Sequence, residues 1–144
     1  MDINVKQADC KYFVDEKNRK VVCVIEDTSM LFFRYIDDFK LDLRASEKFW
    51  KTLIMPHRFV GIATCNENDT FDVETGKLIA FNKAKIKLTT SMFKRAQHYI
   101  SRVDEVFTEI VENFNDFGER LSNNTDRREE RIRALLDEKE VVKE

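Results

Sequence analysis

A stripe of apolar or small side chains at alternating spacings of three and four residues constrains this chain more than any other feature. The mean step of about 3.5 residues is the heptad period, which keeps such a stripe on one side of an α-helix. The spacing therefore predicts a helix about 42 Å long over residues 93–121. The seam comprises Phe93, Ala96, Ile100, Val103, Phe107, Ile110, Phe114, Phe117 and Leu121.

Each large seam residue gains about 1.5–3 kcal/mol on burial, so an uncovered seam would forfeit more than the stability margin of a small domain. We therefore expect a homodimer that forms through this helix as a coiled coil. Coverage by the rest of the chain and coverage by another protein are the alternatives. Large aromatic residues at alternate levels favour an antiparallel helix pair over a tight parallel dimer, where β-branched residues usually fill that position.

Residues that break helices are rare, because the 144 residues include only one Pro and three Gly. Long, mainly helical elements are therefore expected. The polar run at 122–125 is interpreted as a turn, and Asp126 with Glu129 as the capping pair of a last helix over 126–140. Together these features predict a helical hairpin within an extension of residues 91–144. Thr and Ser at 88–91 could kink or break the preceding helix, but it need not end there.

Residues 1–90 are expected to form a separate domain with an antiparallel sheet of three or four strands. The β-branched and aromatic runs "CKYFV" and "KVVCVIE" predict a hairpin with a turn near Asn18, and a third strand is expected over 57–65. Residues 28–55 are ambiguous. "FKLDLR" alternates like a strand, whereas "SEKFWKTLI" is typical of a short helix capped by Ser46.

A helix beginning near Val73 is expected to back this sheet. Residues 69–72 supply its cap, with acidic residues at its positive end. Gly76, Ala80 and Ala84 then recur on one face, where small side chains allow close packing on a sheet. The fold class predicted from these features is α+β.

Charge is unevenly distributed, although 25 basic and 27 acidic residues nearly cancel. Seven basic residues and no acidic one lie between Thr75 and Arg102, whereas residues 103–144 carry 13 acidic and seven basic residues. This asymmetry also favours antiparallel association. A nucleic-acid interface is the alternative function for the basic segment, although an ordinary solvated face has the same composition. Its candidate contacts are Lys83, Lys85, Lys87, Lys94, Arg95 and Arg102.

No motif identifies an enzyme. Cys65 with His57 or His98 could form a thiolate and base, but a buried structural thiol is the simpler interpretation. The acidic loop at 67–74 could hold a divalent ion, yet it lacks the pattern of a calcium loop and more simply caps a helix. We expect no catalysis, no cofactor and no metal. The start of the chain does not resemble a signal peptide and no apolar run is long enough to span a bilayer, so a cytoplasmic protein is expected.

The strand–loop–helix segment of residues 59–85 resembles one found in small uncharacterised proteins of bacteriophages and prophages of Gram-positive bacteria. Its form there is G-x-A-x-C, an acidic loop, then D-x-F-D-x-E-x-G-K-x-I-A and a basic helix. In that family His-Pro often follows the Cys, where this chain has Asn66 and Glu67. The matching residues are Gly61, Ala63, Cys65, Asp69, Phe71, Asp72, Glu74, Gly76, Lys77, Ile79 and Ala80.

The resemblance implies a phage origin and a small sheet backed by a helix, similar to double-stranded-RNA-binding folds. It predicts a non-catalytic interaction protein, acting in the host cytoplasm as a steric inhibitor of a host defence or metabolic protein. A nucleic-acid-binding accessory factor is the alternative.

Overall fold

The computed structural model describes residues 5–37, 41 and 43–141, with side chains described as far as residue 136. The fold class is α+β, as predicted. Two compact units divide the chain, Met1–Arg102 (unit 1) and Val103–Glu144 (unit 2), where the sequence suggested a boundary at residues 90 and 91. The elements in order are η1 (Gln7–Asp9), β1 (Lys11–Asp15), β2 (Lys20–Ile25), α1 (Leu31–Ile36), α2 (Glu47–Thr52), β3 (Phe59–Thr64) and α3 (Val73–Val141).

Unit 1 is built on an antiparallel sheet of three strands in the order β1-β2-β3. The predicted hairpin is confirmed: Tyr12 pairs with Cys23, and Asp15 with Lys20. Its turn is held by Asp15, whose carboxylate accepts from the backbone N–H of Asn18 at 3.0 Å. The predicted third strand is also confirmed, because β3 pairs along the other side of β2.

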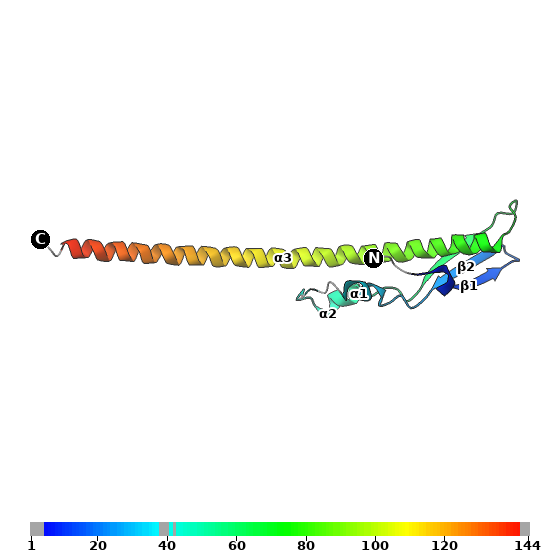
Figure 1. Ribbon diagram of the computed structural model, residues 1–144, viewed down its shortest axis with the longest axis horizontal. Helices are drawn as coiled ribbons and strands as arrows, with labels where there is room; N and C mark the ends of the chain where they lie inside the picture. The colour runs from blue at the N-terminus through cyan, green and yellow to red at the C-terminus, as the bar shows by residue number, and fades with distance from the viewer. Residues whose placement is uncertain (1–4, 38–40, 42, 142–144) are drawn as a thin grey trace. The chain divides into compact units, whose positions relative to one another are not determined.

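The first turns of α3 lie over this sheet (Figure 1), and small residues permit the close approach. A Cβ added at Gly61 would lie 1.9 Å from the carbonyl oxygen of Ala80, and one at Gly76 would lie 2.7 Å from Cγ2 of Val21. Ala80 and Ala84 are fully buried. The prediction that small residues let this helix lie on a sheet is therefore confirmed.

The segment between β2 and β3 packs against a later stretch of α3 within unit 1. The predicted short helix is confirmed as α2, with the Ser46 hydroxyl accepting from the N–H of Phe49 at 3.3 Å. Of the alternative strand at 39–44, residues 39, 40 and 42 lie outside the described residues. Two contacts join the region of α2 to α3. The rings of Phe49 and His98 meet edge to face with their centroids 5.1 Å apart, and the Arg95 guanidinium donates to the carbonyl of Ile54 at 2.7 Å.

Helix α3 is continuous, so the predicted helical hairpin is wrong. Of the two alternatives at 88–91, the helix continues and does not break. The turn expected at 122–125 does not occur, and the predicted helices 91–121 and 126–140 are parts of one element. The hydroxyls at both places bond inside the helix: Thr89 donates to the carbonyl of Lys85, and Thr125 to that of Leu121, each at 3.0 Å. The helix thus accommodates these polar side chains without a break.

Candidate interaction surface on helix α3

Unit 2 presents a row of exposed apolar side chains along α3. Phe114 is 70% exposed and Phe107 is 64% exposed. Within the described part of unit 2, α3 is the only helix or strand, so no second element of that unit covers the row. We call this row the apolar stripe; it comprises Phe107, Ile110, Val111, Phe114, Phe117, Leu121, Ile132, Leu135 and Leu136.

The apolar stripe keeps to one side of the helix over its whole length. At about 100° per residue, its nine members fall within an arc of about 120°. Thr125 and Arg128 fall on the same arc and connect Leu121 to Ile132. Such an arc is typical of a helix that buries one face against another element, and here no described residue of the same chain covers that face.

The predicted seam divides between the two units: its first three residues belong to unit 1, and the others, from Val103 on, belong to unit 2. Phe93 and Ile100 are exposed and lie in unit 1, whereas Ala96 and Val103 are half-buried. The remaining seam residues, from Phe107 to Leu121, belong to the stripe. Coverage of the seam by the chain itself, one of the alternatives, is therefore not observed among the described residues.

The sequence prediction left Val111 out of the seam, and it placed Ile132, Leu135 and Leu136 in a separate helix over 126–140. It ended the seam at Leu121 because the polar run that follows suggested a turn. The sequence does contain a sign that the helix continues, because the helical spacing of three and four residues leads from Leu121 through Thr125 and Arg128 to Ile132.

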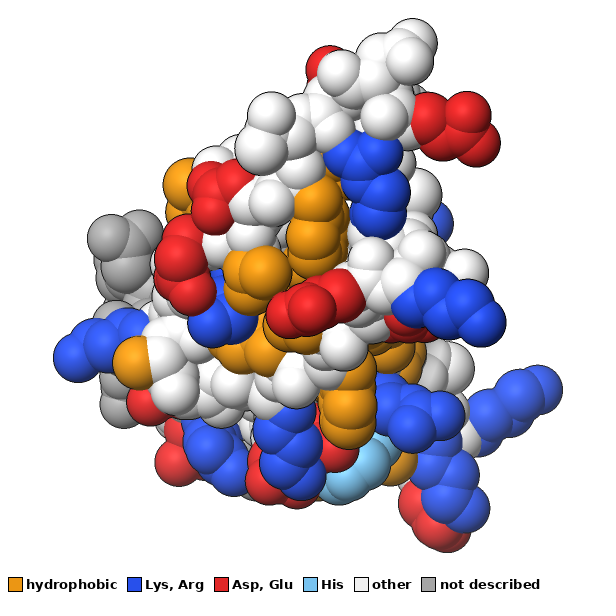
Figure 2. Space-filling view, turned by 90° about the vertical axis from the view of Figure 1, so that its right-hand side faces the viewer, with side chains coloured by type: hydrophobic (Ala, Val, Ile, Leu, Met, Phe, Trp, Pro, Cys, Tyr) orange, Lys and Arg blue, Asp and Glu red, His pale blue; other side chains and the backbone are white. Residues whose placement is uncertain are grey.

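Most of the basic residues proposed for nucleic acid make contacts inside unit 1. The Lys83 and Lys87 ammonium groups donate to the carbonyls of Ile62 and Val60, at 3.0 and 2.7 Å. Lys85 lies 5.7 Å from the Phe81 ring centroid. Arg95 donates to Ile54 and Arg102 to the Leu43 carbonyl, whereas Lys94 is exposed. Figure 2 shows basic and acidic side chains mixed on the face it views, without a continuous field of one sign.

The residues considered for catalysis are not brought together. Cys65 and His57 lie beyond opposite ends of β3, a six-residue strand of about 20 Å. The Cys65 thiol is 3.3 Å from the Arg19 guanidinium and borders a cavity of about 300 Å³ near the start of α3. The nearest side-chain partner of the His98 imidazole is instead the Thr52 hydroxyl, at 3.1 Å. A thiolate–imidazole pair is therefore not assembled by these residues.

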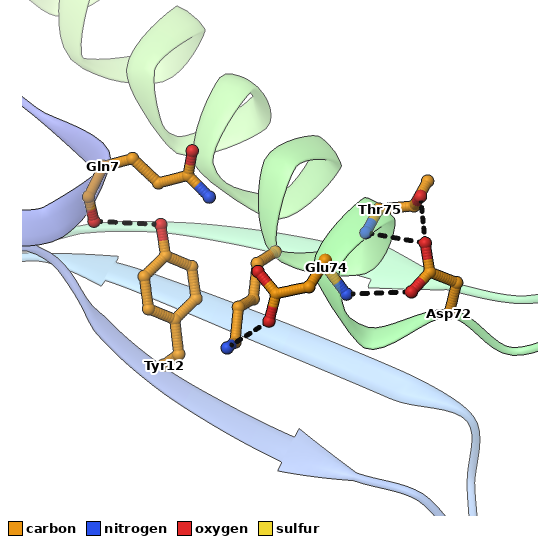
Figure 3. A network of polar contacts seen from close by, with 6 residues as sticks. Gln7, Tyr12, Asp72, Glu74 and Thr75 are labelled. Atoms are coloured by element: carbon orange, nitrogen blue, oxygen red, sulfur yellow. Dashed lines mark hydrogen bonds and ion pairs between the residues drawn. The ribbon is translucent and has the colours of Figure 1, made fainter.

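The acidic loop caps α3, and the predicted helix start near Val73 is confirmed. The Asp72 carboxylate accepts from the Thr75 hydroxyl and from the N–H groups of Thr75 and Glu74, and these bonds hold its pKa below the ordinary value (Figure 3). The neighbouring Lys77–Glu74 ion pair is 2.8 Å long. Among the residues that the structure describes, no group of three or more His, Cys, Asp or Glu side chains is placed to hold a metal.

Of the other two cysteines, Cys10 lies between η1 and β1, and Cys23 lies in β2. Cys23 is fully buried. Burial and the neighbouring Cys23 raise the pKa of Cys10 to about 12, so this thiol is protonated at neutral pH. In the described chain, no helix combines the length and hydropathy needed to cross a membrane.

Comparison with known proteins returns no protein-family model, no curated protein and no solved structure that matches this chain. The phage resemblance therefore stays a prediction, and the apolar stripe is the strongest functional feature of the described residues.

Proposed function

We propose that this chain is a non-catalytic interaction protein that self-associates through the apolar stripe of α3. The observation that carries the proposal is the exposure of nine large apolar side chains on one face of one helix. Scattered apolar residues are normal on a protein surface, but a row of apolar residues on one helix face, interrupted only at Thr125 and Arg128, marks an interaction site.

The energetics favour association over exposure. A large apolar side chain contributes about 1.5–3 kcal/mol when fully buried, so a dozen half-buried side chains contribute on the order of 9–18 kcal/mol. The loss of free motion on association costs about 4–15 kcal/mol. A micromolar complex needs a net gain of about 8 kcal/mol, which burial of six stripe residues from each copy reaches only when the gain is near the top of its range and the cost near the bottom of its own. Each further stripe residue that the pair buries adds to the net gain.

Two other predicted functions have less support. Steric inhibition of a host protein stays a prediction of the phage resemblance, because no side chain described here identifies such a target. Nucleic-acid binding stays a prediction as well, and the engagement of Lys83, Lys87, Arg95 and Arg102 by backbone carbonyls gives these residues a structural role.

A matched pair of variants tests the proposal. Phe114→Glu places a carboxylate on the midline of the stripe, midway between its two flanks. Asn123→Glu places one on the opposite face of the same helix. We expect the wild type and Asn123→Glu to elute as dimers in size-exclusion chromatography and Phe114→Glu as a monomer, with its dissociation constant raised at least about 100-fold. Trp50 fluorescence, which reports on unit 1, should be the same in all three.

The proposal is wrong if the wild type elutes as a monomer at tens of micromolar, or if Phe114→Glu dimerises as tightly as Asn123→Glu.

A further inference from the structure

We infer that two copies of this chain pair antiparallel along residues 103–136, with the twofold axis between Glu119 and Arg120. This inference rests on the proposed self-association and adds its orientation and register. Phe107 of one copy then lies beside Ile132 of the other, Phe114 beside Thr125, and Phe117 beside Leu121 and Ser122.

The start of the stripe limits where a second helix can lie. The stretch of α3 that precedes the stripe is engaged within unit 1, where Met92 and Tyr99 are buried. The Tyr99 ring lies 6.4 Å from the Phe32 ring, and its hydroxyl accepts from the N–H of Leu41 at 3.3 Å. A partner helix at 92–99 would have to displace these contacts, which confines it to the stripe.

The far end of the stripe selects the register. A pairing centred on Glu112 would match Phe107 with Phe117 and Ile110 with Phe114. It would also bring Ile132 and its neighbours opposite residues 88–92, three of which, Leu88, Ser91 and Met92, are already buried in unit 1. Centring the pair between Glu119 and Arg120 instead gives every stripe residue a position on the partner helix.

The distribution of charged residues along the helix favours an antiparallel pair over a parallel one. The first part of the helix carries six acidic residues and no basic one: Asp104, Glu105, Glu109, Glu112, Asp116 and Glu119. The second part, residues 120–136, carries three acidic residues and five arginines: Arg120, Arg127, Arg128, Arg131 and Arg133. An antiparallel pair sets the first part of each copy against the second part of the other.

Two details of the flanks support the antiparallel pair. Asp104 and Arg133 fall on the same flank of the stripe, and Glu109 and Arg131 share the other, so each acid meets an arginine of the second copy. In a parallel pair in register, Arg128 would face Arg128 across the seam, and like charges at a seam position are destabilising.

Distances between identical spin labels distinguish the arrangements. A nitroxide is attached to an encoded p-acetylphenylalanine at Thr108 or at Ser122, two exposed positions beside the stripe, so that the native cysteines are unchanged. The inferred register offsets the two Thr108 labels by about 35 Å along the helix axis and the two Ser122 labels by about 8 Å. Pulsed dipolar spectroscopy on the full chain should therefore find the longer distance at Thr108.

The other outcomes are separable. Pairing centred on Glu112 reverses the order, with offsets of about 12 Å at Thr108 and about 30 Å at Ser122. A parallel dimer gives no axial offset at either site. Either result in a sample that sediments as a dimer overturns the inferred register while self-association stands, whereas a sample that sediments as a monomer overturns the proposed function itself.

Discussion

At Gly61 the sheet and α3 are in close contact. A methyl group there would lie within 2.5 Å of the Ala84 backbone nitrogen as well as against Ala80, and backbone atoms cannot rotate away as a side chain can. Gly118 is the opposite case: it lies inside the same helix, and an added Cβ would meet nothing within 4 Å. Glycine is thus required by packing at the first position and not at the second.

The same substitution should therefore have opposite effects at these two glycines. Gly61→Ala is expected to lower the free energy of unfolding by about 1–3 kcal/mol or more through overpacking. Gly118 falls on the arc of the apolar stripe, so its variant is compared at a concentration where the chain is monomeric. There Gly118→Ala should leave the free energy of unfolding unchanged or raise it by up to about 1 kcal/mol through helix propensity. Urea unfolding followed by Trp50 fluorescence and by circular dichroism measures both. Equal stability of Gly61→Ala and wild type would contradict the close packing of α3 on β3.

Asp72 makes stability depend on pH in a defined direction. Because its hydrogen bonds to Thr75 and Glu74 lower its pKa, its contribution is present above the ordinary aspartate pKa of about 3.9 and is lost as pH falls through the lower folded value. We expect Asp72→Ala to melt at a lower temperature than the wild type at pH 7, and the gap to narrow below pH 4. Asp69→Ala, in the same loop, serves as the control. A gap that does not change with pH would show that Asp72 is not the cap.

At the scale of the elements, predictions based on neighbouring residues were confirmed, whereas the prediction that a turn interrupts the long helix was wrong. The Asp72 and Ser46 caps and the strand patterns depend on residues only a few positions apart, which the sequence displays directly. The turn expected at 122–125 failed because the preferences of Ser, Asn and Thr against helix are weak, and helix propagation is cooperative. The contacts of Leu41 and Ile54 with α3 join positions more than 40 residues apart, for which local patterns carry no signal.

Strand β3 forms one edge of the sheet, and lysines from α3 cover part of it. The N–H of Cys65 donates to Arg19 across the sheet, so alternate residues, including Val60 and Ile62, turn their backbone groups outward. Lys83 and Lys87 bond to those outward carbonyls. Charged groups of this kind discourage an edge strand from pairing with other chains.

Removal of both lysines should therefore weaken the fold. The Lys83→Ala/Lys87→Ala variant is expected to lose about 1–3 kcal/mol of unfolding free energy, because each hydrogen bond contributes about 0.5–1.5 kcal/mol. Lys94→Ala, at an exposed position on the same helix, should change it by less than about 0.5 kcal/mol. Unchanged stability of the double variant, together with loss of DNA or RNA binding at about 50 mM salt, would instead favour the nucleic-acid function.

At the scale of the whole molecule, the near-zero total charge conceals an acidic stretch of α3 at 103–119 and a stretch at 120–136 in which arginines outnumber acidic residues. The apolar stripe runs along both stretches. One copy of the chain cannot satisfy either feature, because α3 is the only element of unit 2 that the structure describes. A second copy satisfies both when it lies antiparallel. The sequence alone indicated the stripe and the asymmetry, but not that the helix continues past residue 121 and extends the stripe.

Sedimentation equilibrium of the unmodified full chain tests the central claim most directly. Measured from about 1 to 100 µM, the molar mass should rise to twice that of the 17.1 kDa chain. Self-association through exposed apolar surface predicts this rise and its persistence at high salt, since burial of apolar area is not screened. A mass of 17.1 kDa at every concentration would contradict the account.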